Sequence, residues 1–237
     1  MDQATGKAIE EFLARLGADA ERAFEAIRGS ATTSPWASFQ RPGDIVLTRG
    51  RRPLSHLNAV LQSVLEGGIA RATHAMMVAA PGYYVDASIR FGVSVLPAQL
   101  FCIDGVVERM RAVAVGEQAT APRPMWRRRL VAAFRHPDFE NQPERHQALQ
   151  QAIAEQLGQP YNMRFIFKRV ADPDDDRSAF CSELVARTFA KLGLPIVPER
   201  RFAAVLPHTL LRSLGNQGWV DVSNDYRTGL NGAVAAS

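Results

Sequence analysis

Apolar residues recur along this chain with the spacing of amphipathic helices in three long segments. The spacing predicts helices over residues 7–28, 54–65 and 143–157, with Gly67 and Gly68 ending the second and Gly158 ending the third. We expect the first helix to pack on the core or on a second chain. The expected apolar face of the second helix consists of Leu54, Leu57, Val60, Leu61, Val64 and Leu65.

Shorter apolar runs bounded by turn residues are typical of strands. They predict strands near residues 43–47, 72–79, 83–88 and 106–115. Pro81 and Gly82 mark a tight turn between the second and third of these strands. Helices and antiparallel strands in one chain predict an α+β fold.

Composition fits one compact core with short appendages. The chain has 237 residues, 46% of them hydrophobic, and two cysteines, so a scaffold built on disulfides is not expected. We divide it into an N-terminal helix and linker (1–40), a folded domain (41–222) and a flexible tail (223–237). The first residues lack a secretory signal pattern, and no window reaches the roughly 18 apolar residues of a membrane span. We therefore expect a protein that is cytoplasmic, or exported without a cleaved signal peptide.

Cys181 is the strongest candidate for chemistry. It follows an acidic loop and opens a segment with apolar residues at helical spacing. With Ser178 as the expected N-cap, the thiol falls in the first turn of a helix. Unpaired backbone N–H groups and the helix dipole favour a thiolate there, and the thiolate is the nucleophilic form. The alternative is a buried structural cysteine, which is what we expect of Cys102.

A thiolate nucleophile requires an imidazole base, preferably oriented by a carboxylate. His74 lies in the predicted strand 72–79, and Asp86 lies in the returning strand 83–88. A hairpin centred near Pro81 puts Asp86 opposite Met76, on the same face as His74 and diagonal to it, within reach of a hydrogen bond. A register shift of one residue would move Asp86 to the other face and leave His74 without a partner.

Five short motifs occur in an order that resembles a known family. They are residues 43–47, 73–74, 85–87, 158–162 and 180–185. The order resembles the circularly permuted branch of the NlpC-type papain-like cysteine hydrolases, the YiiX/YaeF-like group, in which the histidine precedes the cysteine. The resemblance extends over residues 41–215. It implies a permuted papain-like fold in which a sheet carrying His74 and Asp86 faces a helix that begins near Cys181.

Two positions depart from the pattern of that family. Asp86 stands where the family usually has glutamate, so the side chain is one methylene shorter, and Phe180 stands where a tyrosine often precedes the cysteine. Tyr161, Ser182 and the backbone N–H groups at the helix start are the candidates for contact with an oxyanion or the substrate. The same departures motivate an alternative of another class, an inactive binding or adaptor module.

The resemblance implies acyl transfer through the thiol. His74 takes the thiol proton, Cys181 attacks a carbonyl, and water releases the acyl-enzyme. The permuted relatives are associated with lipid-like amides or esters, and the unpermuted ones with peptidoglycan peptides. We expect a lipid or acyl-amide substrate and no cofactor. The alternative is a peptidoglycan peptidase or amidase, including one delivered into another cell as an effector.

Positive charge is concentrated in one segment of a chain with a net charge of +4. Between residues 118 and 137 there is no acidic residue, and the segment carries Arg123, Arg127, Arg128, Arg129 and Arg135. A solvated helix face that pairs with nearby acids is the simpler interpretation, and contact of Arg127, Arg128 and Arg129 with an anionic membrane surface is the alternative. The sequence has no nucleic-acid-binding motif and no histidine spacing typical of zinc, so we expect neither nucleic acid nor metal.

Overall fold

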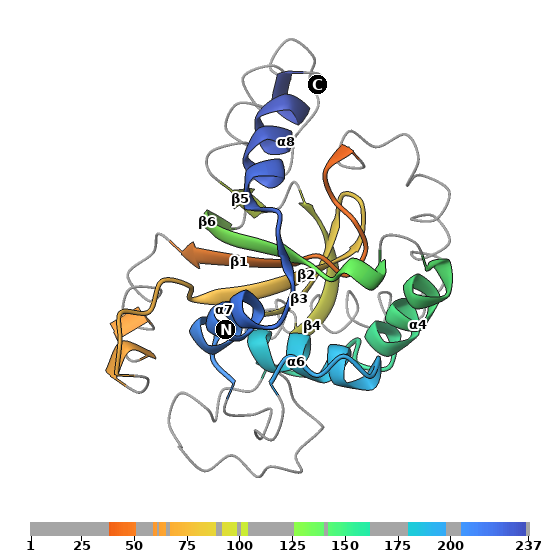
Figure 1. Cartoon of the computed structure of the whole chain (residues 1–237), viewed down its shortest axis with the longest axis horizontal. Coiled ribbons are helices and arrows are strands. Elements are labelled where there is room, and N and C mark those ends of the chain that lie inside the picture. Colours follow the sequence, from red (N-terminus) through yellow and green to blue (C-terminus); the bar gives the residue numbers. More distant parts are fainter. Residues whose placement is uncertain are drawn as a thin grey trace, which may run out of the picture.

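The computed structural model describes residues 38–50, 59–60, 62–64, 67–88, 92–98, 101–103, 126–139, 142–161, 180–197 and 205–235. Within these ranges a single sheet has helices packed on both of its faces (Figure 1). The predicted helix over residues 7–28 and the predicted strand near residues 106–115 lie outside the described residues. The α+β class predicted from the sequence is confirmed.

The sheet has the strand order β4-β3-β2-β1-β6-β5, and β7 also pairs with β6. Neighbouring strands are antiparallel except β5 and β6, which run parallel. The strands are β1 (Ile45–Gly50), β2 (His74–Ala80), β3 (Tyr83–Ser88), β4 (Gly92–Pro97), β5 (Phe101–Ile103), β6 (Trp126–Arg135) and β7 (Val220–Asp221). The helices are α4 (Pro143–Ala154), α6 (Cys181–Lys191), α7 (Pro207–Asn216) and α8 (Ser223–Ala235), with a short 3-10 helix η3 (Pro137–Phe139).

Alternation along the strands divides the core into two apolar clusters. Ile45, Met77 and Val85 pack with buried residues of α4, α6 and α7 on one face, which we call the α6 face. Val46, Met76 and Tyr84 pack with Tyr226 of α8 on the other, the α8 face. Figure 1 shows α8 standing apart from the other three helices. Because successive strand residues point to opposite faces, the position of each polar residue in the sheet follows from its apolar neighbours.

Residues 126–135 of the arginine-rich segment form strand β6, so the interpretation of this part as a solvated helix face is wrong. Its residues pair with β1 in the register Ile45↔Phe134 and Arg49↔Arg129. Apolar residues of β6 complete both faces of the sheet between β1 and β5, which a helix at this position could not do. Arg129 is exposed, whereas Arg135 is buried and forms an ion pair with Asp44.

The predicted flexible tail is wrong as well, because residues 223–235 form α8. Asp221 Oδ1 accepts a hydrogen bond from the Ser223 N–H at the start of the helix. Tyr226 is fully buried, its hydroxyl donates to Asp44 Oδ2 at 2.9 Å, and its ring meets that of Phe39 edge-on. The folded domain therefore includes Phe39 and α8, and its predicted limits at residues 41 and 222 are too narrow.

The segment predicted as a helix over residues 54–65 is helical at residues 59–60 and 62–64, and of its predicted apolar face only Val60 and Val64 lie in the described residues. Val60 is 59% exposed and Val64 is 76% exposed, whereas Ala59 and Gln62 are buried.

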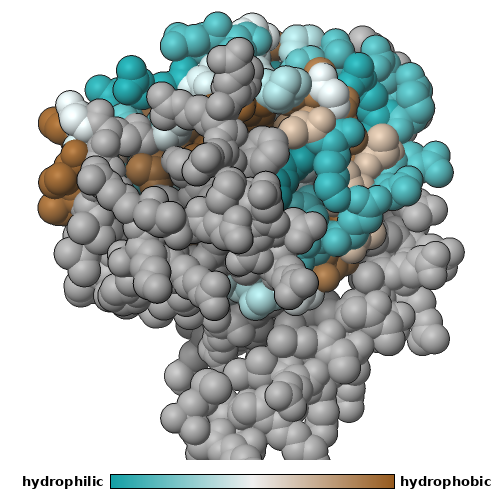
Figure 2. Space-filling view, turned by 90° about the horizontal axis from the view of Figure 1, so that it is seen from below, coloured by the Kyte–Doolittle hydropathy of each residue, from teal (hydrophilic) through white to brown (hydrophobic). Residues whose placement is uncertain are grey.

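Elsewhere the described surface is largely hydrophilic on the side shown in Figure 2, with apolar residues gathered mainly at one edge. None of the helices in the described ranges has the length and apolar character needed to cross a bilayer.

Candidate active site

Cys181 is the first residue of α6, which confirms the prediction that the thiol lies in the first turn of a helix. Phe180 is the N-cap in an extended conformation, so the prediction of Ser178, which lies outside the described residues, is wrong. Phe180 has no side-chain acceptor. Instead its backbone N–H donates to Glu183 Oε2 at 3.0 Å, and Glu183 forms an ion pair with Arg187 one turn further on. Glu183, at the third helical position, thus caps the N-terminus of α6.

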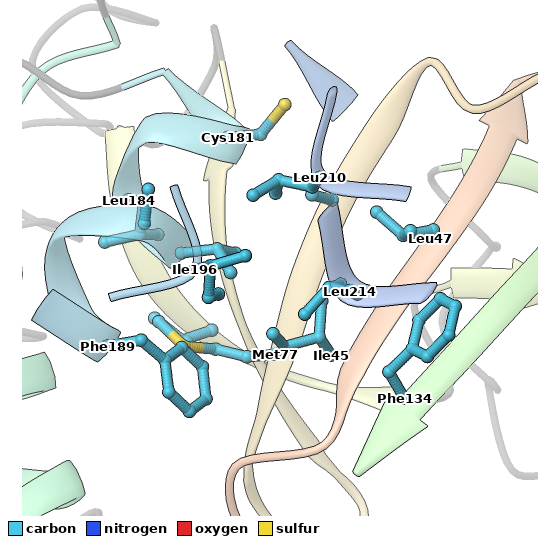
Figure 3. Close-up of a cluster of buried hydrophobic side chains, with 14 of the residues drawn as sticks. Ile45, Leu47, Met77, Phe134, Cys181, Leu184, Phe189, Ile196, Leu210 and Leu214 are labelled. Carbon is cyan, nitrogen blue, oxygen red and sulfur yellow. The ribbon is translucent and has the colours of Figure 1, made fainter. Parts of the chain in front are cut away.

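The Cys181 side chain is 1% exposed and lies at the margin of the cluster on the α6 face. Figure 3 shows its sulfur directed away from the labelled apolar side chains of that cluster. The next residue, Ser182, is fully buried, and its hydroxyl donates to the carbonyl of Val205 at 2.5 Å. This hydroxyl is therefore engaged in holding the chain before α7. What Ser182 can offer to an oxyanion is its backbone N–H.

The histidine and the carboxylate predicted from the hairpin lie together. The register Met77↔Val85 and Val78↔Tyr84 puts Asp86 opposite Met76, diagonal to His74, as predicted. His74 Nε2 lies 2.5 Å from Asp86 Oδ1, so aspartate reaches the imidazole in spite of its shorter side chain. Neither Asp86 oxygen makes a further hydrogen bond to the described part of the chain. Because Nε2 contacts the carboxylate, Nδ1 is the ring nitrogen left for a second partner.

The electrostatic environment of His74 favours the imidazolium. Burial and the positive charge of Arg128 both lower the pKa of His74. The negative charges of Asp86 and Cys181 raise this pKa, and together they outweigh the lowering. The net result is a pKa of about 8, above the ordinary 6.5. At neutral pH the described centre therefore holds a protonated imidazole, the partner that a thiolate requires.

Cys181 and His74 are linked by electrostatics and by no direct contact. Asp86 and His74 share the α8 face with Met76 and Tyr84, whereas α6 packs on the opposite face. The sheet that carries His74 and Asp86 does pack against α6, through strands β2 and β3. No hydrogen bond joins Cys181 to His74, although the charge of Cys181 raises the pKa of His74. The two groups are within electrostatic range where β2 begins.

Tyr161 follows α4 and lies beside the cysteine helix. Its ring centroid is 5.6 Å from that of Phe180. Burial raises the pKa of Tyr161 well above 10, and the negative charges of Cys181 and Asp86 raise it further. Its hydroxyl therefore stays protonated as a hydrogen-bond donor near the thiol. The segment before it is fixed to β4, because the Val93 N–H donates to the carbonyl of Gln159 at 2.8 Å.

Arg128 is a site residue that the sequence reasoning did not identify. It lies on β6 opposite Gly50, near the beginning of the strand. Burial lowers its pKa, and the negative charges of Asp86, Cys181 and Tyr161 act in the opposite direction. The run of arginines in the sequence indicated concentrated positive charge. Only the alternation of side chains along strand β6 shows that Arg128 and Arg129 point to opposite faces of the sheet.

Within the described ranges, no group of three or more histidine, cysteine, aspartate or glutamate residues could hold a metal ion. No protein-family model, curated protein or solved structure matches this chain.

Proposed function

We propose that this chain is a thiol hydrolase that cleaves an amide or ester bond through an acyl-enzyme. The observation that supports the proposal is the buried His74–Asp86 pair, together with a cysteine at the first position of a helix whose charge acts on His74. A nucleophile, a base and a group that orients the base form the constellation that acyl transfer requires.

The proposed steps use these three side chains and water. The proton of the Cys181 thiol passes to His74, most directly to Nδ1, and Asp86 holds the ring and stabilises the imidazolium. The thiolate attacks the substrate carbonyl, and the oxyanion that forms is stabilised by backbone N–H groups at the start of α6 and by Tyr161. His74 then returns the proton to the leaving amine or alcohol as the carbon–nitrogen or carbon–oxygen bond breaks. Water attacks the thioester while His74 takes a proton from it, the carbon–sulfur bond breaks to release a carboxylic acid, and His74 returns the proton to the sulfur of Cys181.

Within this class, we assign the chain to the circularly permuted NlpC-type hydrolases. The order of the elements supports this assignment, since the histidine strand β2 and the carboxylate strand β3 precede the cysteine helix α6. We propose a lipid or acyl-amide substrate. Apart from the resemblance, it is supported by Ile69, which is 80% exposed on the segment leading into β2, and by the exposed Val60 and Val64.

The experiment compares wild type with Cys181→Ala, His74→Ala and Asp86→Ala. Each is incubated with phospholipid vesicles, N-acyl amino acids and purified peptidoglycan, and the products are identified by mass spectrometry. We expect acyl products that Cys181→Ala and His74→Ala abolish and that Asp86→Ala reduces without abolishing, because orienting the base contributes less than the base itself. The matched control, Cys102→Ala, should retain activity.

Two outcomes would contradict these proposals. Muropeptide fragments that depend on Cys181, without an acyl product, would replace the lipid substrate by peptidoglycan. No product from any substrate, with all variants folded, would favour a binding module, for which the absence of a Cys181–His74 hydrogen bond is the structural argument.

A further inference from the structure

Exposed apolar side chains are concentrated in one short segment before β2. Val60, Val64 and Ile69 are three of the four large apolar residues that are exposed in the described part of the chain. The fourth, Val220, lies on β7. A single exposed apolar residue is normal on a protein surface, but three in one short segment form a patch that calls for a ligand or a partner.

Local hydrogen bonds hold these three side chains together. Val60 and Val64 are four positions apart in a helical segment, so they share one face of it. The chain then turns back onto Ser63, whose hydroxyl oxygen accepts a hydrogen bond from the Ala70 N–H at 2.9 Å. Ile69 directly precedes Ala70, so it is held beside the helical segment and adds to the same patch.

Arginines without ion pairs lie at the same end of the sheet. Arg49 of β1 is directly opposite Arg129 of β6, and Arg71 lies just before β2. Because β1 is antiparallel to β2 and β6, its end and their starts meet at one end of the sheet. None of these three arginines forms an ion pair within the described ranges. Like charges directly opposite each other destabilise a sheet, so folding does not explain them.

The sequence around the patch adds positive charge and almost no negative charge. Between Asp44 and Asp86 it has four arginines and one acidic residue, Glu66. Figure 1 shows residues 59–64, drawn in orange, at the left-hand edge of the molecule, on the side where β1 ends. Figure 2 keeps that edge on the left, and the brown apolar surface gathers mainly there. Apolar and basic side chains therefore occupy one edge of the molecule.

We propose that this edge docks on an anionic lipid bilayer. We call it the docking edge, and it consists of Arg49, Val60, Val64, Ile69, Arg71 and Arg129. A bilayer of this kind presents negative headgroups above hydrocarbon, which matches positive charge beside aliphatic side chains. The inference deepens the proposed lipid substrate and rests on that proposed function. Its consequence for the site is direct, because His74 begins β2 five positions after Ile69.

The test is co-sedimentation of the full chain with vesicles of phosphatidylcholine alone or of phosphatidylcholine with phosphatidylglycerol. All proteins carry Cys181→Ala, so that no lipid is consumed during the measurement. Ile69→Ser and Arg71→Gln each remove one member of the docking edge. The matched controls are Val220→Ser, at the far end of β6, and Arg227→Gln, an exposed arginine on α8.

We expect binding to the anionic vesicles that weakens as salt is raised, and little binding to the neutral vesicles. Ile69→Ser should lower the partition coefficient about tenfold, because one aliphatic side chain no longer leaves water. Arg71→Gln should lower it about fivefold, because one charge near the surface is lost. The two controls should bind as the parent does. All four substitutions fall on exposed side chains, so Tm should be unchanged, which circular dichroism checks.

Absence of binding to the anionic vesicles would overturn the inference, and so would equal losses in the variants and the controls. Analytical ultracentrifugation identifies the other occupant. A dimer that Ile69→Ser dissociates, without vesicle binding, would assign the edge to a second copy of the chain.

Failure of the inference and failure of the proposed function give different results. A wild-type protein that cleaves soluble N-acyl amino acids but binds no vesicles would keep the hydrolase and refute the docking edge. Vesicle binding that depends on Ile69 and Arg71, without any product that depends on Cys181, would keep the docking edge and refute the hydrolase.

Discussion

The His74–Asp86 pair allows the sharpest quantitative prediction, through the substitution Asp86→Asn. Asparagine keeps the shape of the side chain and removes its charge. The difference between the His74 pKa of about 8 and the ordinary 6.5 corresponds to about 2 kcal/mol in favour of the imidazolium. Burial and Arg128 both lower this pKa, so without the Asp86 charge only Cys181 supports the imidazolium. We therefore expect the pKa of His74 in Asp86→Asn to fall to about 6.5 or below.

The assay is an NMR titration of ring carbon–proton signals in protein labelled with ¹³C-histidine, between pH 5 and pH 9.5. The His74 signal is assigned by its absence in His74→Gln. The control is Asp138→Asn, because Asp138 lies 3.9 Å from a different histidine, His136, and should leave the His74 titration unchanged. A His74 that still titrates near pH 8 in Asp86→Asn would refute the reasoning that the carboxylate sets its protonation.

The same pair makes a prediction about stability. A histidine whose pKa is raised by folding stabilises the protein fully below its unfolded pKa of 6.5, and the contribution is lost as the pH rises through about 8. Wild type should therefore lose about 2 kcal/mol of unfolding free energy between pH 6 and pH 9 from this group, and Asp86→Asn should not. Urea denaturation at the two pH values measures the difference, and equal pH dependence in both proteins would contradict the assignment.

Two further substitutions test how the site is held. Tyr226→Phe removes a hydroxyl that donates to the fully buried carboxylate of Asp44. The free energy of unfolding should fall by about 1–3 kcal/mol, and Tm should fall by several degrees in thermal denaturation. An unchanged Tm would mean that α8 does not depend on this hydrogen bond. Gly92→Ala would drive a Cβ into the carbonyl oxygen of Gln159, which precedes Tyr161, at a φ of +63°. It should be less stable in urea by about 1 kcal/mol or more than Gly218→Ala, which has a similar φ of +76° and no atom within 4 Å, and an equal loss would show that the close approach to β4 is unimportant.

The sequence by itself determined those parts of the site that depend on local chain geometry. The Pro81-Gly82 turn and the period of two in strands were enough to put Asp86 diagonal to His74, and helical spacing was enough to place Cys181 in a first turn. These relations involve residues a few positions apart or joined by one tight turn. They therefore do not depend on how the rest of the chain folds.

Only the tertiary structure decided which surface each element buries. A run of arginines and apolar residues is compatible with a helix face until β1 and β5 are seen on either side of β6. Arg128 enters the site only because of that pairing. Likewise, small, turn-prone residues predicted a flexible tail, but α8 packs because Tyr226 reaches Asp44, 182 positions away. Contacts between segments that are distant in the sequence provide most of the free energy gained by burying apolar surface. The local pattern of apolar and polar residues does not indicate which distant segment will make these contacts.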